Sequence, residues 1–189
     1  MRPDELPRLF AAIDADLNTT AHDFIWLSVL TGARKANVLA MRWSEIDWGN
    51  RTWRIADTKS GQPHVVPLTD RALEILTTRK AEGPGEWVFP SMTSATGHLA
   101  DPKKAWQRIL ERAEINDLRI HDIRRTLGSY QAIAGASLSV IGKSLGHKSQ
   151  RATEVYARLH LDPVRASIEA ATEAMFRHRK TNSADNDCS

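Results

Sequence analysis

The stretch HDIRRTLGSY, from His121 to Tyr130, places a histidine, two adjacent arginines and a tyrosine in one predicted helix. His121 and Arg124 are three residues apart, so they share one helix face. Tyr130 comes nine residues after His121, and at about 100° of rotation per residue it points away from that histidine. We therefore predict that Tyr130 is a packing residue, and Tyr156, the only other tyrosine, becomes the candidate for chemistry.

Each short motif in this chain is weak evidence when taken alone. An HxxR pair is usually a solvated helix face, and LGH is commonly a helix end with Gly146 as its C-cap and His147 beyond it. A lone tyrosine is usually half-buried. The joint occurrence, in order, of TGAR, a lysine in a turn, HxxR, LGH and a late tyrosine is far more specific.

This ordered set resembles the catalytic domain of the tyrosine recombinases, the phage-integrase family, and above all those of prophage and genomic-island integrases. The resemblance extends from about residue 4 to 176 and implies the fold of that catalytic domain. It also implies a catalytic set that is complete in type and order: Arg34 in TGARKANVLAMRW, Lys59 in DTKSGQPHVVPL, His121 and Arg124 in HDIRRTL, His147 in LGHKS, and Tyr156 in EVYARL as the nucleophile.

The chemistry of a phosphodiester explains why such a set is needed. The negative charge of the diester repels nucleophiles, and two guanidiniums, Arg34 and Arg124, can clamp its non-bridging oxygens as charge builds in the transition state. A phenol with a pKa of about 10 must lose its proton to attack, and His121 is the candidate base. Lys59, on a turn, can protonate the leaving oxygen. His147 can donate a further hydrogen bond to the phosphate.

The implied reaction conserves bond energy. Tyr156 attacks the DNA backbone, forms a phosphotyrosyl ester and releases a 5′-hydroxyl, and a 5′-hydroxyl from a partner strand then attacks that ester. We therefore expect no ATP, no other cofactor and no metal ion. The sequence contains no carboxylate cluster or HExxH pattern that would suggest a metal site.

One position departs from the family pattern, and two alternative functions stay open. The family usually has an acidic residue three positions after the first arginine, where this chain has Asn37, and an amide can hydrogen-bond but adds no charge. A non-catalytic DNA-binding remnant of an integrase would predict a broken catalytic set, and only Asn37 points that way. A type IB topoisomerase shares the chemistry, but the short chain and the LGHKS motif favour a recombinase.

The charge balance permits a nucleic-acid partner without requiring one. The chain has 189 residues, 26 Lys and Arg against 23 Asp and Glu, and a formal net charge of +3. The resemblance implies double-stranded DNA as the partner. Basic residues near the predicted site are candidates for phosphate contacts, although a solvated surface explains each one equally well: Lys35, Lys143, Lys148 and Arg151.

The remaining composition favours a cytoplasmic protein without a membrane partner, and the resemblance implies a bacterial cytoplasm. Cys188 is the only cysteine, so one chain can form no disulfide, and a reducing compartment is the natural setting. The N-terminal MRPDELPRLF carries charges where a signal peptide would be apolar. The longest apolar stretch, FIWLSVL, is too short to span a bilayer.

The elements that must position these residues are mainly helical, with one small antiparallel sheet, an α+β arrangement. Strand-like runs separated by Gly49-Asn50 and by Thr58 to Pro63 predict the sheet. Within these runs Trp53 and Ile55 alternate with Arg54, and Val66 and Leu68 alternate with Val65 and Pro67. Apolar periodicity predicts helices in PDELPRLFAAIDADL, HDFIWLSVLTG, ARKANVLAM, TDRALEILTTRK and PKKAWQRILERAEI, and then over 121–134, 138–145, 153–159 and 163–179.

We expect residues 1–179 to form the catalytic domain and 180–189 to be a disordered polar tail, with the family's N-terminal core-binding domain absent from this chain. Val164, Ile168 and Met175 lie at helical spacing in the last helix. That face can pack on its own domain or, as the resemblance implies, on a neighbouring protomer. The family resemblance implies a tetramer on DNA and a monomer without it.

Overall fold

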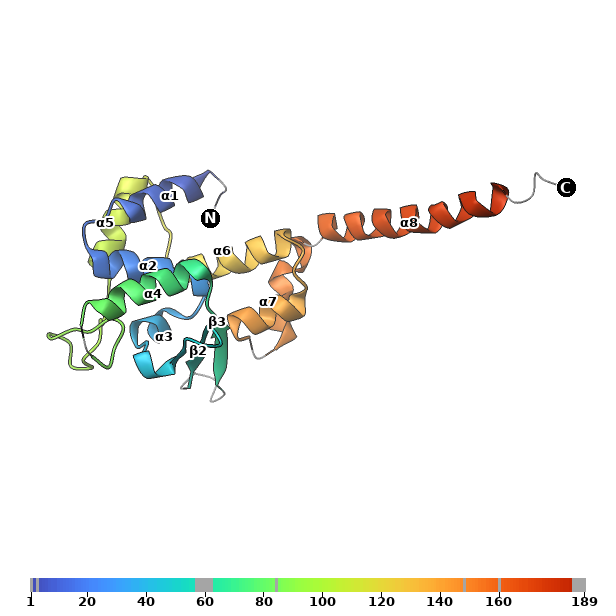
Figure 1. Cartoon of the computed structure of the whole chain (residues 1–189). Coiled ribbons are helices and arrows are strands. Elements are labelled where there is room, and N and C mark those ends of the chain that lie inside the picture. Colours follow the sequence, from blue (N-terminus) through green and yellow to red (C-terminus); the bar gives the residue numbers. More distant parts are fainter. Residues whose placement is uncertain are drawn as a thin grey trace.

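The computed structural model describes residue 2 and residues 4–56, 63–83, 85–147, 149–159 and 161–184. The described chain is mainly helical with one three-stranded antiparallel sheet, which confirms the predicted fold class (Figure 1). The body of the molecule carries the sheet, and the last helix extends away from it (Figure 1).

The helix α2 (Thr19–Thr31) lies at the centre of the larger hydrophobic core. Phe24, Ile25 and Leu27 are fully buried on different sides of this helix, as expected for a helix that is apolar around most of its circumference. Asn18 caps its N-terminus, and Gly32 ends it in the left-handed conformation. The helices that pack on α2 include α1 (Glu5–Asp14), α3 (Lys35–Leu39) and α4 (Asp70–Ala81). A further helix, α5 (Lys103–Ala113), packs on α1.

The sheet has the order β1 (Ile46–Asp47), β2 (Thr52–Ile55) and β3 (His64–Pro67), with a short 3-10 turn, η1 (Trp43–Glu45), before β1. Trp53 is buried opposite the buried Val66, whereas Arg54 is exposed opposite the exposed Val65. The predicted alternation is therefore confirmed, and one face of the sheet closes the core.

A second, smaller hydrophobic cluster joins the elements that follow. The helices α6 (Ile120–Ile133) and α7 (Leu138–Leu145) pack with two 3-10 segments, η2 (Gln150–Ala152) and η3 (Glu154–Leu159). The predicted helix over 153–159 is thus a 3-10 segment that begins one residue later. Its tighter turn seats Tyr156 in a cluster with Ala132, Ile141 and Leu145.

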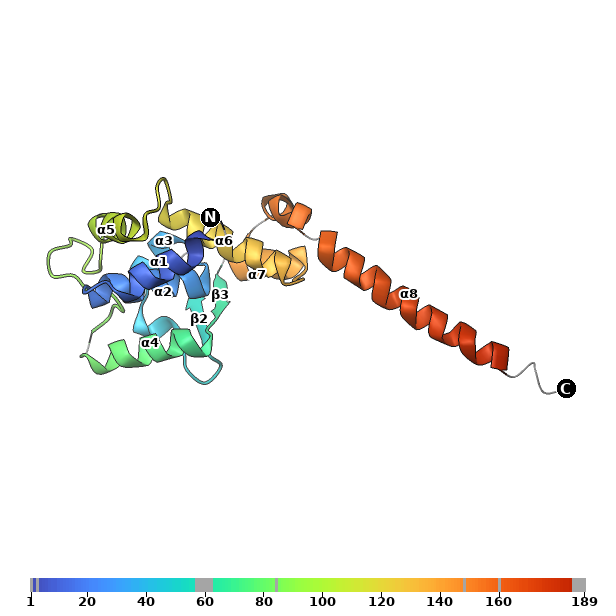
Figure 2. The same ribbon diagram turned by 90° about the horizontal axis from the view of Figure 1, so that it is seen from above.

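The last helix, α8 (Leu161–Ala184), leaves the body at the edge formed by α6 and α7, in both views (Figures 1 and 2). The sequence predicted that this helix ends at 179 and that a disordered tail follows. That prediction was wrong for residues 180–184, which continue the helix, and residues 185–189 lie outside the described part. No helix among the described residues is long and apolar enough to cross a membrane.

Candidate active site

Three of the predicted site residues, Arg34, Arg124 and His147, meet at the C-terminal end of α7. The last carbonyls of a helix have no partner within it and carry partial negative charge. Arg124, on α6, donates from Nη1 to the carbonyl of Gly32 at 2.6 Å. Its Nη2 donates to the carbonyl of Leu145. Arg34, just before α3, donates to the carbonyl of Gly146 at 3.5 Å. Arg124 therefore ties the end of α2 to the end of α7, and Arg34 joins it there.

Arg124 is buried, and neither it nor Arg34 has a carboxylate partner in the described part of the chain. Arg124 is 6% exposed. Its burial, together with the charge of Arg34 and against an opposing effect of Tyr156, lowers its pKa to about 10. Arg124 still carries its charge near pH 7. Neither Arg34 nor Arg124 forms an ion pair with a carboxylate of the described residues. A buried guanidinium and a half-buried one, hydrogen-bonded to carbonyls among the described residues, are suited to receive an anion.

His147 follows the left-handed Gly146 directly and is half-buried. Its Nδ1 lies 2.9 Å from Oγ1 of the buried Thr153. Burial lowers the pKa of His147, and the charges of Arg124 and Arg34 lower it further. The ring is therefore neutral at pH 7, and Thr153 fixes its orientation.

His121 lies in the first turn of α6, one turn before Arg124, and is exposed. Partial burial lowers its pKa, and the charges of Arg124 and Arg125 act in the same direction. Asp122 opposes this shift but is itself held by Arg119. The imidazole is thus neutral at pH 7 and can accept a proton, as a general base must.

Tyr156 is 4% exposed and packs directly on α6. A Cβ atom added to Gly128 would lie 2.6 Å from Cζ and 2.8 Å from Oη of Tyr156, so the phenol fills the space that this glycine leaves. Burial raises the pKa of Tyr156, and the charges of Arg124 and Arg125 partly lower it again. The structure thus brings Tyr156 beside Arg124 but holds the phenol among apolar neighbours.

Tyr130 lies elsewhere, as its predicted orientation requires. It is 41% exposed and lines an apolar cavity of about 190 Å³ between α1, α2 and α6, together with Phe10 and Leu127. None of the predicted site residues lines this cavity.

The comparisons with known proteins fit this geometry. Residues 1–162 match the profile of the phage integrase family. The chain belongs to the phage integrase family. The motif-based resemblance is therefore confirmed, and the motifs alone were sufficient to find it.

Relatives and solved structures of this family cover most of the chain. Prophage integrase IntF of Escherichia coli K12 is 30% identical over 172 residues, which are 87% of this chain and 36% of IntF. The integrase of Salmonella phage P22 is 28% identical, over 84% of this chain and 43% of the P22 protein. The chain thus spans less than half the length of these two relatives.

Two solved structures show the same fold. The catalytic domain of bacteriophage HP1 integrase superimposes with a TM-score of 0.69 at 21% identity, covering 89% of this chain and 92% of that one. XerH site-specific recombinase bound to its difH substrate gives 0.71 at 20% identity, over 90% and 53% of the two chains.

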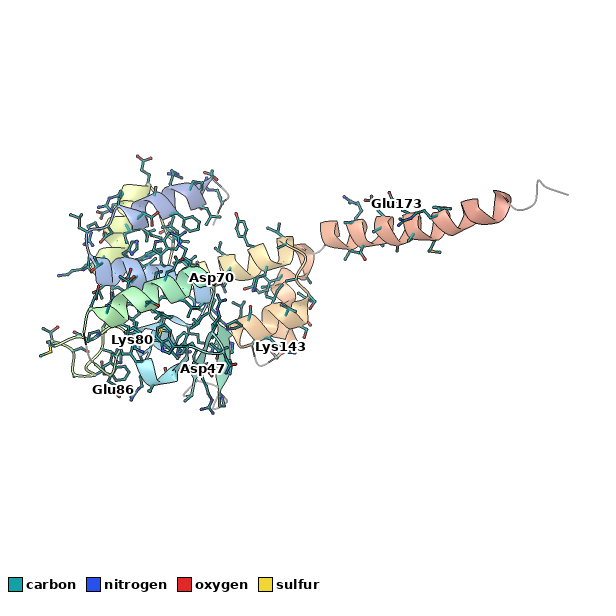
Figure 3. All side chains as sticks on the ribbon, in the orientation of Figure 1. Asp47, Asp70, Lys80, Glu86, Lys143 and Glu173 are labelled. Carbon is teal, nitrogen blue, oxygen red and sulfur yellow. The ribbon has the colours of Figure 1, made fainter. Side chains whose placement is uncertain are left out.

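Some predicted residues of this integrase domain remain untested by the structure. Lys59 and Lys148 lie outside the described residues. Lys143 and Arg151 are exposed, and Lys143, on α7, is labelled in Figure 3. Lys35 is in an ion pair with Asp101 at 2.9 Å, which a phosphate would have to displace.

Asn37, the departure from the family pattern, does not hold Arg34. Its side chain is half-buried and forms no hydrogen bond among the described residues, while its backbone N–H donates to the carbonyl of Arg34 at 2.9 Å. Arg34 rests instead on the carbonyl of Gly146. Among the described residues, the end of α7 is therefore the hydrogen-bond partner of Arg34, and Asn37 is not.

Three residues of the site escaped the sequence analysis. Gly128 lies four residues after Arg124 and Thr153 three residues before Tyr156, spacings that place them on shared faces. His64 begins β3 and lies against Gly146, where an added Cβ atom would be 2.7 Å from its Nδ1. The sequence did contain a signal for His64. It is a histidine at the start of an otherwise apolar strand, and it follows the turn that carries the predicted Lys59.

Proposed function

We propose that this chain is the catalytic domain of a site-specific recombinase, which cleaves and rejoins double-stranded DNA through a phosphotyrosyl intermediate during integration or excision of a mobile element. The observation that carries this proposal is the pair Arg34 and Arg124, which lie without a described carboxylate partner at the end of α7, beside Tyr156. Two neighbouring guanidiniums, one of them buried beside a phenol, supply the charge that phosphotyrosine formation requires.

The arginines bind the non-bridging oxygens of the scissile phosphate. A guanidinium has five N–H donors, and Arg124 uses two nitrogens on the carbonyls of Gly32 and Leu145, so it is oriented and still has donors to offer. His147 joins them: when the hydroxyl of Thr153 donates to Nδ1, the ring proton is on Nε2 and is available to the phosphate.

His121 accepts the phenolic proton of Tyr156, and Lys59 protonates the 5′ oxygen that leaves. Tyr156 must first move, because its ring is packed on Gly128. Binding of DNA to the arginines supplies a phosphate that draws the phenol out of this apolar position. The single chain without DNA is therefore a resting form.

Assembly on DNA is the second part of this proposal. Four apolar residues of α8 are between 50% and 73% exposed: Val164, Ile168, Met175 and Phe176. Figure 3 shows α8, with Glu173 labelled, extending away from the body. Val164, Ile168 and Met175 share one face, and no described residue covers it, which favours packing on a neighbouring protomer, in a tetramer on DNA and a monomer without it.

The decisive experiment is a search for a denaturant-resistant protein–DNA adduct on nicked duplexes made from the element's own junction sequences. The nick lets the cleaved strand diffuse away, so the intermediate accumulates. The chain is tested as it stands and joined to an N-terminal DNA-binding domain. DNA binding without an adduct in either form would favour the non-catalytic remnant, and relaxation of supercoils without strand exchange would favour the topoisomerase.

A further inference from the structure

His64 is a site residue with no place in the catalytic set above. Its Nε2 lies 2.9 Å from the backbone oxygen of Lys143, in the last turn of α7. A carbonyl only accepts, so Nε2 must carry the ring proton. The ring also covers Gly146, where an added Cβ atom would lie 2.7 to 2.9 Å from three of its atoms. Only a glycine lets β3 and the end of α7 come this close.

The end of α7 is held by three basic side chains. The carbonyls of Lys143, Leu145 and Gly146 accept hydrogen bonds from His64, Arg124 and Arg34 respectively. These donors come from β3, from α6 and from the residue before α3. Two of the three are the proposed phosphate clamp.

His64 acts on this turn without charge. Burial lowers its pKa, and the charges of Arg124 and Arg34 lower it further, so the ring is neutral at pH 7. It lines the same open cavity of about 490 Å³ as His147, but its Nε2–H already has a partner. A neutral ring committed to a backbone carbonyl positions the turn rather than binding the phosphate itself.

We propose that His64 is a positioning residue for the phosphate clamp. It fixes the last turn of α7 against β3, and that turn sets the carbonyls on which both arginines rest. This inference rests on the proposed function, and its experiment separates the two.

The test compares His64→Leu with His64→Gln by the rate of adduct formation on the nicked duplex. Leucine keeps most of the volume and removes the donor, whereas the glutamine Nε2 can still donate to the carbonyl of Lys143. We expect a loss of about tenfold to a hundredfold for the leucine variant, since small misplacements of a clamp have effects of this size. The glutamine variant should stay within about threefold of wild type, and Val65→Ala controls for damage to β3.

A second readout excludes a merely structural effect. A methylphosphonate at the scissile position is neutral, so its cleavage depends less on the arginines. If His64 acts through them, the deficit of His64→Leu relative to wild type should shrink on this substrate, and we expect the same of Arg34→Ala. A variant that is only less well folded shows the same deficit on both substrates.

The outcomes are distinct. If wild type forms the adduct, three results overturn this inference and leave the proposed function standing. The first is that His64→Leu is as fast as wild type, the second that it is equally impaired on both substrates, and the third that it is no worse than His64→Gln. No adduct from wild type on any duplex overturns both.

Discussion

The two tyrosines lie on opposite faces of α6, and their environments are nearly inverted. Tyr130 is 41% exposed beside the apolar residues of α1, whereas Tyr156 is 4% exposed beside Arg124 and Gly128. Exposure alone would select Tyr130 as the reactive phenol. The charge of Arg124 beside Tyr156 opposes the rise in pKa that burial causes and so favours the phenolate. The proposed function therefore selects Tyr156 on its charged surroundings, whereas accessibility alone would select Tyr130.

The largest expected effect tests this comparison directly. Tyr156→Phe removes only a hydroxyl and should abolish the covalent adduct while DNA binding persists. Tyr130→Phe is the matched control and should leave the adduct nearly unchanged. Adduct formation is measured on denaturing gels, and binding by retardation of the same duplex. If Tyr130→Phe eliminated the adduct and Tyr156→Phe did not, the assignment would be reversed.

The next effect concerns the charge beside Tyr156. Arg124→Lys keeps the charge but loses the planar fork that reaches Gly32 and Leu145 and that we propose also binds the phosphate. We expect a loss of about 10²–10³ in cleavage rate, the size seen when one oxyanion donor is removed. Arg125→Lys, at the exposed neighbour, is the control and should change little. Near-normal single-turnover cleavage by Arg124→Lys would count against the clamp.

The proposed base gives a smaller effect with a defined sign. The pKa of His121 is lowered by burial and by the charge of Arg124. The imidazole therefore becomes protonated only in solution more acid than its ordinary pKa of about 6.5. The cleavage rate should therefore be flat around pH 7 and fall only in more acid solution, as His121 becomes protonated.

A pH–rate profile checks this, together with His121→Gln, which should lose about a hundredfold at pH 7. His147 also has a lowered pKa. Its own variant, His147→Gln, separates the two titrations. A His121→Gln protein that kept both the rate and the acid limb would exclude His121 as the base.

The smallest expected effect concerns the position in which Tyr156 rests. Gly128→Ala places a methyl group within 2.6 Å of the buried ring, so the ring must shift. We expect a net loss of about 1–2 kcal/mol in the free energy of unfolding, because overpacking costs more than the better helix propensity of alanine returns. Urea unfolding measures this, with Gly85→Ala as the control, since no atom lies within 4 Å of its added Cβ.

The same variant sharpens the comparison of the tyrosines. Burial is the main cause of the raised pKa of Tyr156, so displacement of the ring should lower that pKa toward its ordinary value. A spectrophotometric titration of the two tyrosines, with Tyr130→Phe to isolate Tyr156, detects the change. An unchanged pKa together with unchanged stability would show that Gly128 does not hold the ring.

The sequence by itself determined what is local. Apolar periodicity and caps predicted most helices, and alternation predicted the buried and exposed faces of β2 and β3. Asn18 and Thr69 cap the N-termini of α2 and α4 through their own side chains. The family and the identities of the proposed catalytic residues also followed from ordered motifs, each a short stretch of chain.

Only the tertiary structure decided which of these residues meet and what lies between them. The bond from Arg34 to Gly146 spans 112 residues and that from His64 to Lys143 spans 79, and no local pattern encodes such contacts. The burial of Tyr156 depends on a missing side chain at Gly128 on another helix. The length of α8 was misjudged because its polar end lacks the apolar periodicity by which helices are predicted. Local rules specify elements, but a site forms where close packing brings the ends of distant elements together.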